Sequence, residues 1–220
     1  MCVRKLKLST MGSTPPPPSE SQLRTCEGLI AKSLDESPMV RILVRAMEAR
    51  GCALNPARHI ACENCSGDLA GGFDVEVNQV VICANKCGTA EKVTQILTHE
   101  LVHMFDHCSA KVDFANIEHL ACSEVRAANL AHCKPFGLEG SLLGSRDDCV
   151  REKAARSVSL IKGVSSDVAM KAVGRVFFKC RNDLEPIGRV TYNTESELCA
   201  LREFNSIYSK VKQCSEKKKS

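Results

Sequence analysis

The sequence predicts an α+β domain that is mostly helical and carries a small sheet. Apolar residues recur at helical spacing over several long segments, whereas a single short segment, residues 73–83, alternates as a strand does. Hydrophobic residues make up 44% of the chain and charged residues 25%, which are ordinary globular values and exclude a mostly disordered protein. The apolar runs stay far below the ~20 residues that a membrane-spanning helix needs.

The first expected elements follow a separate leader. Residues 1–22 combine basic residues with a proline run at 15–18, and we expect a disordered, basic and proline-rich leader there. An apolar core of the kind found in secretory signals is absent from this segment. Residues 23–50 have helical periodicity with a break, and Gly51 ends the run. Residues 51–72 are expected to form a loop.

The later elements are again mainly helices. Residues 73–83 predict one strand or a short hairpin that turns at Asn78. Thr89 can cap the helix that follows, whose apolar positions continue to Met104. Residues 183–189 contain a proline and a glycine and predict a turn. Three more helices are expected at residues 117–130, 149–161 and 166–180.

The charge balance argues against nucleic acid as a direct partner. Thirty Lys and Arg residues against 26 Asp and Glu residues give a net charge of +4, and part of it lies near the end of the chain. The chain has no Trp and only two Tyr, so an aromatic surface for stacking bases is not expected either. We expect the folded domain at residues 23–208, followed by a basic tail at 209–220.

The segment His99-Glu100-Leu101-Val102-His103 carries the clearest chemical signal. Residues four apart lie on one face of a helix, so His99 and His103 can bind one zinc ion together. Zinc lowers the pKa of a bound water to about 7, and Glu100 can take a proton from that water and deliver it to the leaving amine. The pattern therefore predicts a zinc peptidase, and the competing interpretation is a helix with two surface histidines.

A catalytic zinc needs a third protein ligand, and the sequence offers several. The metzincin pattern is absent, because Asp106 and Ser109 stand where it requires a glycine and a histidine. Glu124 lies on a later expected helix, as in zinc peptidases whose third ligand is a glutamate, and it is the preferred ligand. Asp106 is the alternative, although it is better suited to orient a ligand histidine through a hydrogen bond. His107 is a weaker candidate. His119 could support a ligand or donate a hydrogen bond in the transition state, but an ordinary helix-surface histidine is the preferred interpretation.

The cysteines allow two interpretations. Fourteen cysteines are many for a reduced cytosolic protein. Cys62 and Cys65, followed by Cys83 and Cys87, resemble a zinc ribbon, although the second spacing is one residue longer than usual. The other cysteines are scattered along the chain, which disulfides explain better. The residues favour disulfides and leave the ribbon open.

The strand segment 73–83 also has two interpretations beside such a site. An exposed sheet edge can bind an extended peptide by adding it as a further strand. An ordinary core strand would only pack against the helices. The sequence does not separate these two roles.

Longer segments around the motif resemble the mitochondrial inner membrane zinc metalloproteases that act in ATP synthase assembly, some of which carry the name Ku-binding protein. The likeness extends from about residue 25 to residue 205. The segments that carry it are LTHELVHMFDHC at 97–108, HLACSEVRAANL at 119–130, CVREKA at 149–154 and NDLEPIGR at 182–189.

The resemblance implies a zincin-like metallopeptidase domain with Zn²⁺ as cofactor. His99 and His103 would be zinc ligands, and Glu100 the catalytic acid and base. It implies a peripheral position at the mitochondrial inner membrane, on the intermembrane-space side, a compartment that supports disulfides. The expected protein substrate is an ATP synthase membrane subunit precursor with an N-terminal extension. The alternatives are a non-proteolytic assembly factor for ATP synthase and a Ku-associated nuclear adaptor.

Overall fold

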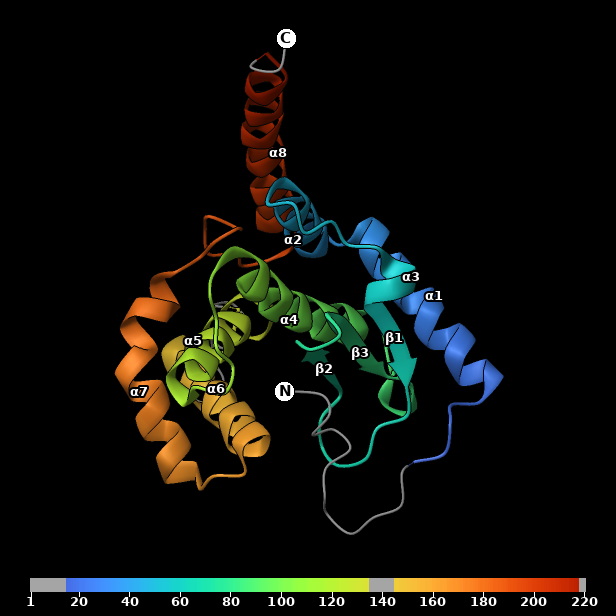
Figure 1. Ribbon diagram of the computed structural model, residues 1–220, viewed down its shortest axis with the longest axis vertical. Helices are drawn as coiled ribbons and strands as arrows, with labels where there is room; N and C mark the ends of the chain where they lie inside the picture. The colour runs from blue at the N-terminus through green and yellow to red at the C-terminus, as the bar shows by residue number, and fades with distance from the viewer. Residues whose placement is uncertain (1–14, 135–144, 218–220) are drawn as a thin grey trace.

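A long helix, α4 (Ala90–Ser109), lies at the centre of the computed structural model, between a small sheet and a layer of three helices (Figure 1). The structure describes residues 15–134 and 145–217, except for the side chains of 211–217. Most of the expected leader and the last residues of the expected tail lie outside these described residues. The expected α+β class with mostly helix is confirmed.

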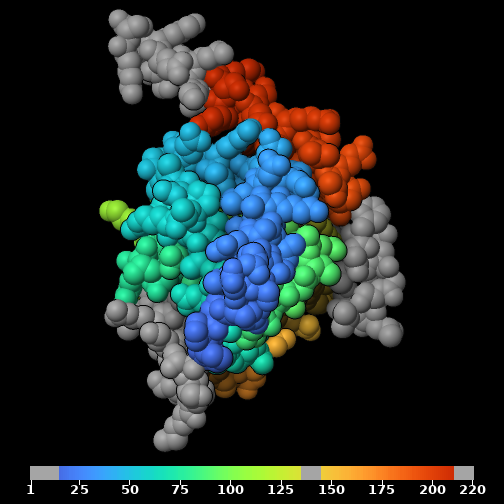
Figure 2. Space-filling model, turned by 90° about the vertical axis from the view of Figure 1, so that its right-hand side faces the viewer, coloured from blue at the N-terminus to red at the C-terminus, as the bar shows by residue number. Residues whose placement is uncertain are grey.

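Two helices cover one side of α4. Helix α1 (Glu20–Glu36) begins with a capping box, in which the side chains of Ser19 and Gln22 each accept a hydrogen bond from the other residue's backbone N–H. Ser37 ends α1 and caps α2 (Pro38–Ala49), because a proline starts a helix well but cannot continue one. This is the break expected in the first helical segment. Figure 2 shows α1 lying across the surface on this side.

The sheet has three strands in the order β1-β3-β2. Strands β2 (Gly71–Asp74) and β3 (Gln79–Cys83) are antiparallel, and Asn78 in the turn between them has a left-handed φ of 51°. The hairpin, rather than a single strand, is therefore the correct interpretation of residues 73–83. Strand β1 (Ile60–Glu63) pairs in parallel with β3 on its other side, which leaves β2 at an edge.

The expected loop at residues 51–72 is wrong in its middle part. A one-turn helix, α3 (Pro56–His59), leads directly into β1 there. Strand β1 has the sequence Ile-Ala-Cys-Glu, in which apolar and polar residues do not alternate, and its burial does not alternate either. The usual sequence signal of a strand is therefore missing. Its pairing with β3, about twenty residues later, decides its conformation.

A layer of three helices packs on the other side of α4. These are α5 (Ile117–Ala127), α6 (Arg146–Lys162) and α7 (Ser166–Asn182), which confirm the three expected helices and extend two of them. Asn116, Ser145 and Ser165 cap their N-termini. A five-residue π-helical turn, η2 (Ala128–His132), follows α5 without a break.

The last helix projects from the body of the molecule. Helix α8 (Thr194–Lys217) packs against α2 through its first turns, where Ala200 and Leu201 are buried, and its far end stands clear in Figure 1. It crosses the expected boundary at residue 208, just as α1 begins before residue 23. Within the described parts of the chain, no helix is both long and apolar enough to cross a membrane.

Two apolar clusters meet where α4 faces α5. One cluster joins α1, α2, the sheet and α4, with Phe105 among its fully buried side chains. The other joins α5, α6 and α7 around Phe177. Because each cluster holds its own helices by apolar burial, the line between the clusters is where polar side chains from both sides meet.

Disulfides, rather than a zinc ribbon, account for the cysteines. The ribbon hypothesis is wrong because Cys62 is bonded to Cys26, and Cys65 is bonded to Cys83. Among the described residues, Cys87 and Cys199 remain unpaired. The five disulfides are Cys26–Cys62, Cys52–Cys108, Cys65–Cys83, Cys122–Cys180 and Cys133–Cys149.

Replacing both Cys122 and Cys180 by alanine should lower the free energy of unfolding by about 2–4 kcal/mol, because their bond closes a long loop in the unfolded chain. Denaturant unfolding under non-reducing conditions measures the loss. Cys87→Ala is the control, since it removes a free thiol, and it should change stability far less. Equal stability of the double variant and the control would contradict this disulfide.

Candidate metal centre

Three side chains from two facing helices converge between the apolar clusters. His99 and His103 come from α4, and Glu124 comes from α5. The Nε2 atoms of the two histidines lie 3.1 Å apart, and the carboxylate oxygens of Glu124 lie 3.3 Å from His99 Nε2 and 3.4 Å from His103 Nε2. One atom from each side chain lies within 4.8 Å of the others, and no second such group occurs among the described residues.

The donor atoms of this group fit a metal cation. The Glu124 side chain is 1% exposed, and its Oε2 atom, 3.3 Å from His99 Nε2, receives no well-aligned hydrogen bond. A buried carboxylate oxygen without a well-aligned donor is costly, and a cation held jointly with two imidazole nitrogens would satisfy it. Two imidazoles and one carboxylate are also the ligand set of a common type of catalytic zinc site.

In the absence of a metal, the charges of these side chains favour a proton on His103. Burial alone would raise the pKa of Glu124, but the two histidines hold it below its ordinary value. Burial alone would lower the pKa of His103, but the Glu124 carboxylate raises it to about 9. The metal-free site therefore keeps a proton between these side chains, and a metal ion would have to replace it.

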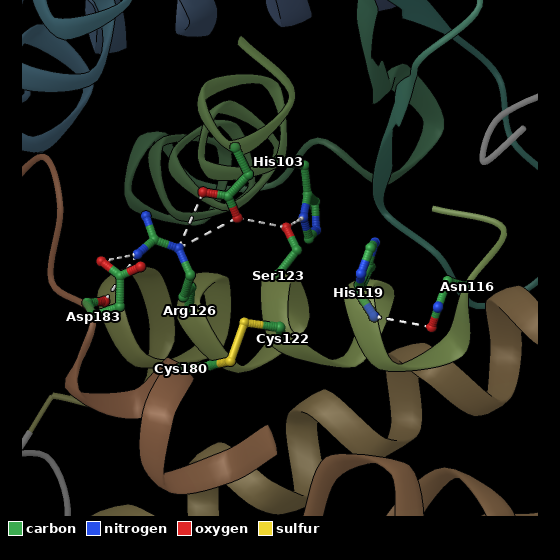
Figure 3. Close-up of a disulfide and its surroundings, with 9 residues drawn as sticks. His103, Asn116, His119, Cys122, Ser123, Arg126, Cys180 and Asp183 are labelled. Atoms are coloured by element: carbon green, nitrogen blue, oxygen red, sulfur yellow. Dashed lines mark hydrogen bonds and ion pairs between the residues drawn. A yellow bond between two sulfur atoms is a disulfide. The ribbon is translucent and has the colours of Figure 1, made fainter. Parts of the chain in front are cut away.

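A chain of hydrogen bonds holds His103 from behind (Figure 3). The Nδ1 atom of His103 lies 2.7 Å from the Ser123 hydroxyl, which in turn donates to Asp106 over 2.7 Å. The Arg126 Nε atom donates to the same carboxylate at 3.0 Å and 3.3 Å. Asp106 therefore lies behind His103 rather than beside the converging atoms, where it can orient that ring but does not share the point at which the three side chains meet.

Arg126 extends this chain to a distant loop. Its guanidinium forms an ion pair with the Asp183 side chain and donates to the carbonyl oxygens of Asp183 and Glu185, the latter over 2.6 Å. The loop is the turn expected at residues 183–189, with a cis peptide bond before Pro186. A buried charge is costly unless it is paired. Arg126 of α5 therefore keeps both α4 and the loop within hydrogen-bond distance of its guanidinium.

Glu100 lies in a cavity beside the three converging side chains. The cavity has a volume of about 40 Å³, enough for a few water molecules, and is lined by His99, Glu100, His103, Glu124 and residues of β2. Burial raises the pKa of Glu100 above its ordinary value. A Cβ atom on Gly71 would lie 2.7 Å from Ile96 and 3.5 Å from the Glu100 stem, so glycine lets β2 approach α4 here.

The other histidine candidates lie away from the converging atoms. His119 is exposed and its Nδ1 accepts a hydrogen bond from the backbone of Asp113, in line with an ordinary surface histidine. His107 is also exposed and contacts Phe73 and Phe114. Neither belongs to the group that can hold a metal.

Three polar residues around the site are absent from the sequence-based candidates. Ser123 and Arg126 are ordinary residues on the same helix as Glu124, and only the packing of that helix on α4 reveals their contacts. His132 lies 3.1 Å from the Nδ1 atom of His99, across to the π-helical turn. Burial and the His99 ring lower the pKa of His132 to about 3, so its own ring is uncharged. No motif spacing connects these residues to the zinc pattern.

Comparison with known proteins decides the family. The sequence model of the peptidase M76 family matches residues 24–188, which is most of the chain. The chain belongs to this family. The M76 family is a family of peptidases, and this match confirms the family resemblance found in the sequence.

Curated relatives of this M76 protein are named mitochondrial inner membrane protease ATP23 or its homolog. The Homo sapiens protein is 43% identical over 187 residues, which is 82% of this chain and 76% of the relative. The Xenopus laevis protein is 39% identical over 191 residues, with 82% and 80% covered. The Meyerozyma guilliermondii protein is 36% identical over 162 residues, with 70% and 66% covered. No solved structure matches the chain.

Asp106→Ala should lower the free energy of unfolding by about 3 kcal/mol, because it leaves the buried Arg126 without one of its two carboxylate partners. Urea unfolding provides the measurement. The matched control is Asp147→Ala, which removes the partner of Arg181 at the half-exposed surface and should cost about 0–1 kcal/mol. A loss no larger than that of the control would show that the buried chain does not stabilise the fold.

Proposed function

We propose that this protein is a zinc-dependent endopeptidase, with His99, His103 and Glu124 as the zinc ligands and Glu100 as the catalytic acid and base. The observation that carries the proposal is the convergence of three acceptor groups on one point, one of them a buried carboxylate oxygen without a well-aligned donor. The peptidase family of the chain and the cavity beside the group support the same reaction.

Each part of the site then has a chemical task. Zinc, when bound, would polarise the scissile carbonyl and make a water acidic enough to lose a proton near neutral pH. Glu100 takes that proton and transfers it to the leaving amine. Ser123 and Asp106 keep the His103 ring in one orientation, so that its Nε2 atom faces the site.

The edge strand offers a place for the substrate. β2 is at the edge of the sheet, and Gly71, Gly72 and Phe73 line the same cavity as Glu100. A peptide that adds to this edge in an extended conformation would pass directly beside the catalytic carboxylate. This placement supports the role of a substrate-binding edge over that of an ordinary core strand.

The relatives suggest where the enzyme acts. Their names describe a mitochondrial inner membrane protease, and the five disulfides suit the intermembrane space better than a reducing compartment. We propose that the enzyme associates peripherally with the inner membrane on that side. Its proposed substrate is an ATP synthase membrane subunit precursor, whose N-terminal extension it removes while assisting assembly of the membrane sector.

A second candidate function is a non-proteolytic assembly factor for ATP synthase. The observation that favours it is the exposure of large apolar side chains away from the cavity. Phe178 on α7 is 71% exposed and Ile207 on α8 is 65% exposed. A partner protein that covered either side chain would be held away from the cavity, and that contact need not depend on proteolysis.

Elemental analysis of the non-reduced protein should find one zinc ion per chain, and none after His99→Ala and His103→Ala are combined. Glu124→Gln should weaken zinc binding, because it removes the charged ligand. Glu118→Gln is its control, since Glu118 lies on the same helix but pairs with Arg175 at the surface. Zinc retained by the double histidine variant would refute the site.

Glu100→Gln should keep one zinc ion per chain and lose proteolysis, because it removes the acid and base but none of the ligands. Cleavage of a precursor peptide with an N-terminal extension, followed by mass spectrometry, measures the loss. Retained turnover would refute the role of Glu100. Full rescue of ATP synthase assembly by this variant, in cells that lack the wild-type protein, would instead favour the assembly factor.

A further inference from the structure

His132 contacts a zinc-ligand candidate from outside the converging group. Its Nε2 atom lies 3.1 Å from His99 Nδ1, and the two ring centroids are 5.0 Å apart. The contact is on the side of the His99 ring opposite to the Nε2 atom that faces Glu124. His132 therefore does not share the cation position, but it touches the ring that would hold the cation.

The direction of this hydrogen bond follows from the chemistry of a ligand histidine. If His99 binds a cation through Nε2, that atom must present a lone pair, so the ring proton is on Nδ1. That proton points to His132 Nε2, which accepts it. His103 is held in the same way, because Ser123 gives its own proton to Asp106 and accepts the Nδ1 proton of His103. Each ligand histidine thus has one acceptor behind it.

The π-helical turn explains how His132 reaches His99. His132 comes eight positions after Glu124, and in an α-helix this spacing would place His132 about 80° past Glu124. The turn Ala128–His132 is closed by a hydrogen bond from Cys133 N to Ala128 O over 3.0 Å, which spans five residues rather than four. Each residue of this turn is therefore rotated about the helix axis by a smaller angle than in an α-helix. The slower winding lets His132 face α4 together with Glu124.

The backbone around His132 is fixed from several sides. The next residue, Cys133, is disulfide-bonded to Cys149 at the start of α6. Arg146 donates to the carbonyl oxygens of Cys133 at 2.9 Å and Asn129 at 3.3 Å, so it holds both ends of the π-helical turn. Such anchoring is what a residue needs if it is to orient another side chain rather than move with it.

We propose that His132 is a positioning residue, which accepts the Nδ1 proton of His99 and so keeps the His99 Nε2 lone pair directed at the metal. This inference rests on the proposed zinc site and adds a residue to it. Partners of this kind typically change metal affinity by about 10–100-fold when they are removed. The effect should appear in zinc binding itself, without any need for a known substrate.

The test compares His132→Phe, which keeps a ring but has no acceptor, with His132→Gln, which can place an oxygen near the position of Nε2. Zinc affinity is measured by competition with a chromogenic chelator, and the visible spectrum of the Co²⁺-loaded protein reports the ligand geometry. We expect His132→Phe to bind zinc about 10–100-fold more weakly, with an altered Co²⁺ spectrum, and His132→Gln to recover most of the affinity. His59→Phe is the matched control, because His59 also accepts a hydrogen bond, from Asn55, but outside the metal group.

The outcomes separate this inference from the proposed function. Wild-type protein that binds no zinc would refute the zinc site itself. Wild-type protein that binds zinc, with a folded His132→Phe variant that binds it equally well, would refute only the role of His132. Equal loss in the phenylalanine and glutamine variants would also refute it, since the acceptor would then not matter. If His132→Phe fails to fold, His132→Leu takes its place in the comparison with His132→Gln.

Discussion

The buried carboxylate of Glu124 sets the conditions for the rest of this structure. It is almost fully enclosed between α4 and α5, and one of its oxygens receives no well-aligned hydrogen bond. Burying a charge is costly unless opposite charge is held close to it, so the two imidazoles of α4 must stay close to this carboxylate. The contact between α4 and α5 is therefore an electrostatic requirement of the fold as well as a packing contact.

The two histidines reach this carboxylate with different support. His103 is held by a series of hydrogen bonds that runs through Ser123 and Asp106 to Arg126. Arg126 in turn binds backbone carbonyl groups and the half-exposed Asp183 carboxylate of the loop. On the Nδ1 side of His99, the hydrogen-bond partner among the described residues is the ring of His132. A chain anchored by several charges resists displacement more than one neutral hydrogen bond does. The His99 side of the site should consequently depend more on the stiffness of the backbone near it.

The disulfides supply that stiffness around the site. Cys52–Cys108 ties the end of α4 to the segment after α2, and Cys122–Cys180 ties α5 to α7. Cys133–Cys149 ties the π-helical turn to α6 directly beside His132. Each element that carries a site residue is thus covalently linked to a neighbour. Cys52–Cys108 lies within the cluster around α4, and the other two bonds lie within the cluster around α5, α6 and α7. The disulfides therefore stiffen each side of the site, while the polar contacts between α4 and α5 hold the two sides together.

The sequence by itself determined most of the long helices and which residues share one helix face, but it predicted neither α3 nor α8. Capping residues, apolar spacing and prolines act locally, so the start of α4 after Thr89 and the shared face of His99 and His103 follow from residues close in the chain. The same local rules marked Glu124 as a candidate but could not exclude Asp106.

Only the tertiary structure decided the contacts between distant segments. It paired β1 with β3, bonded Cys62 to Cys26 rather than to a metal, and placed Asp106 behind His103. It also brought His132 onto the face of Glu124 through a π-helical turn that no residue pattern announces. These contacts depend on how helices and strands pack across long sequence separations, and a packing arrangement is a property of the whole fold rather than of any local segment.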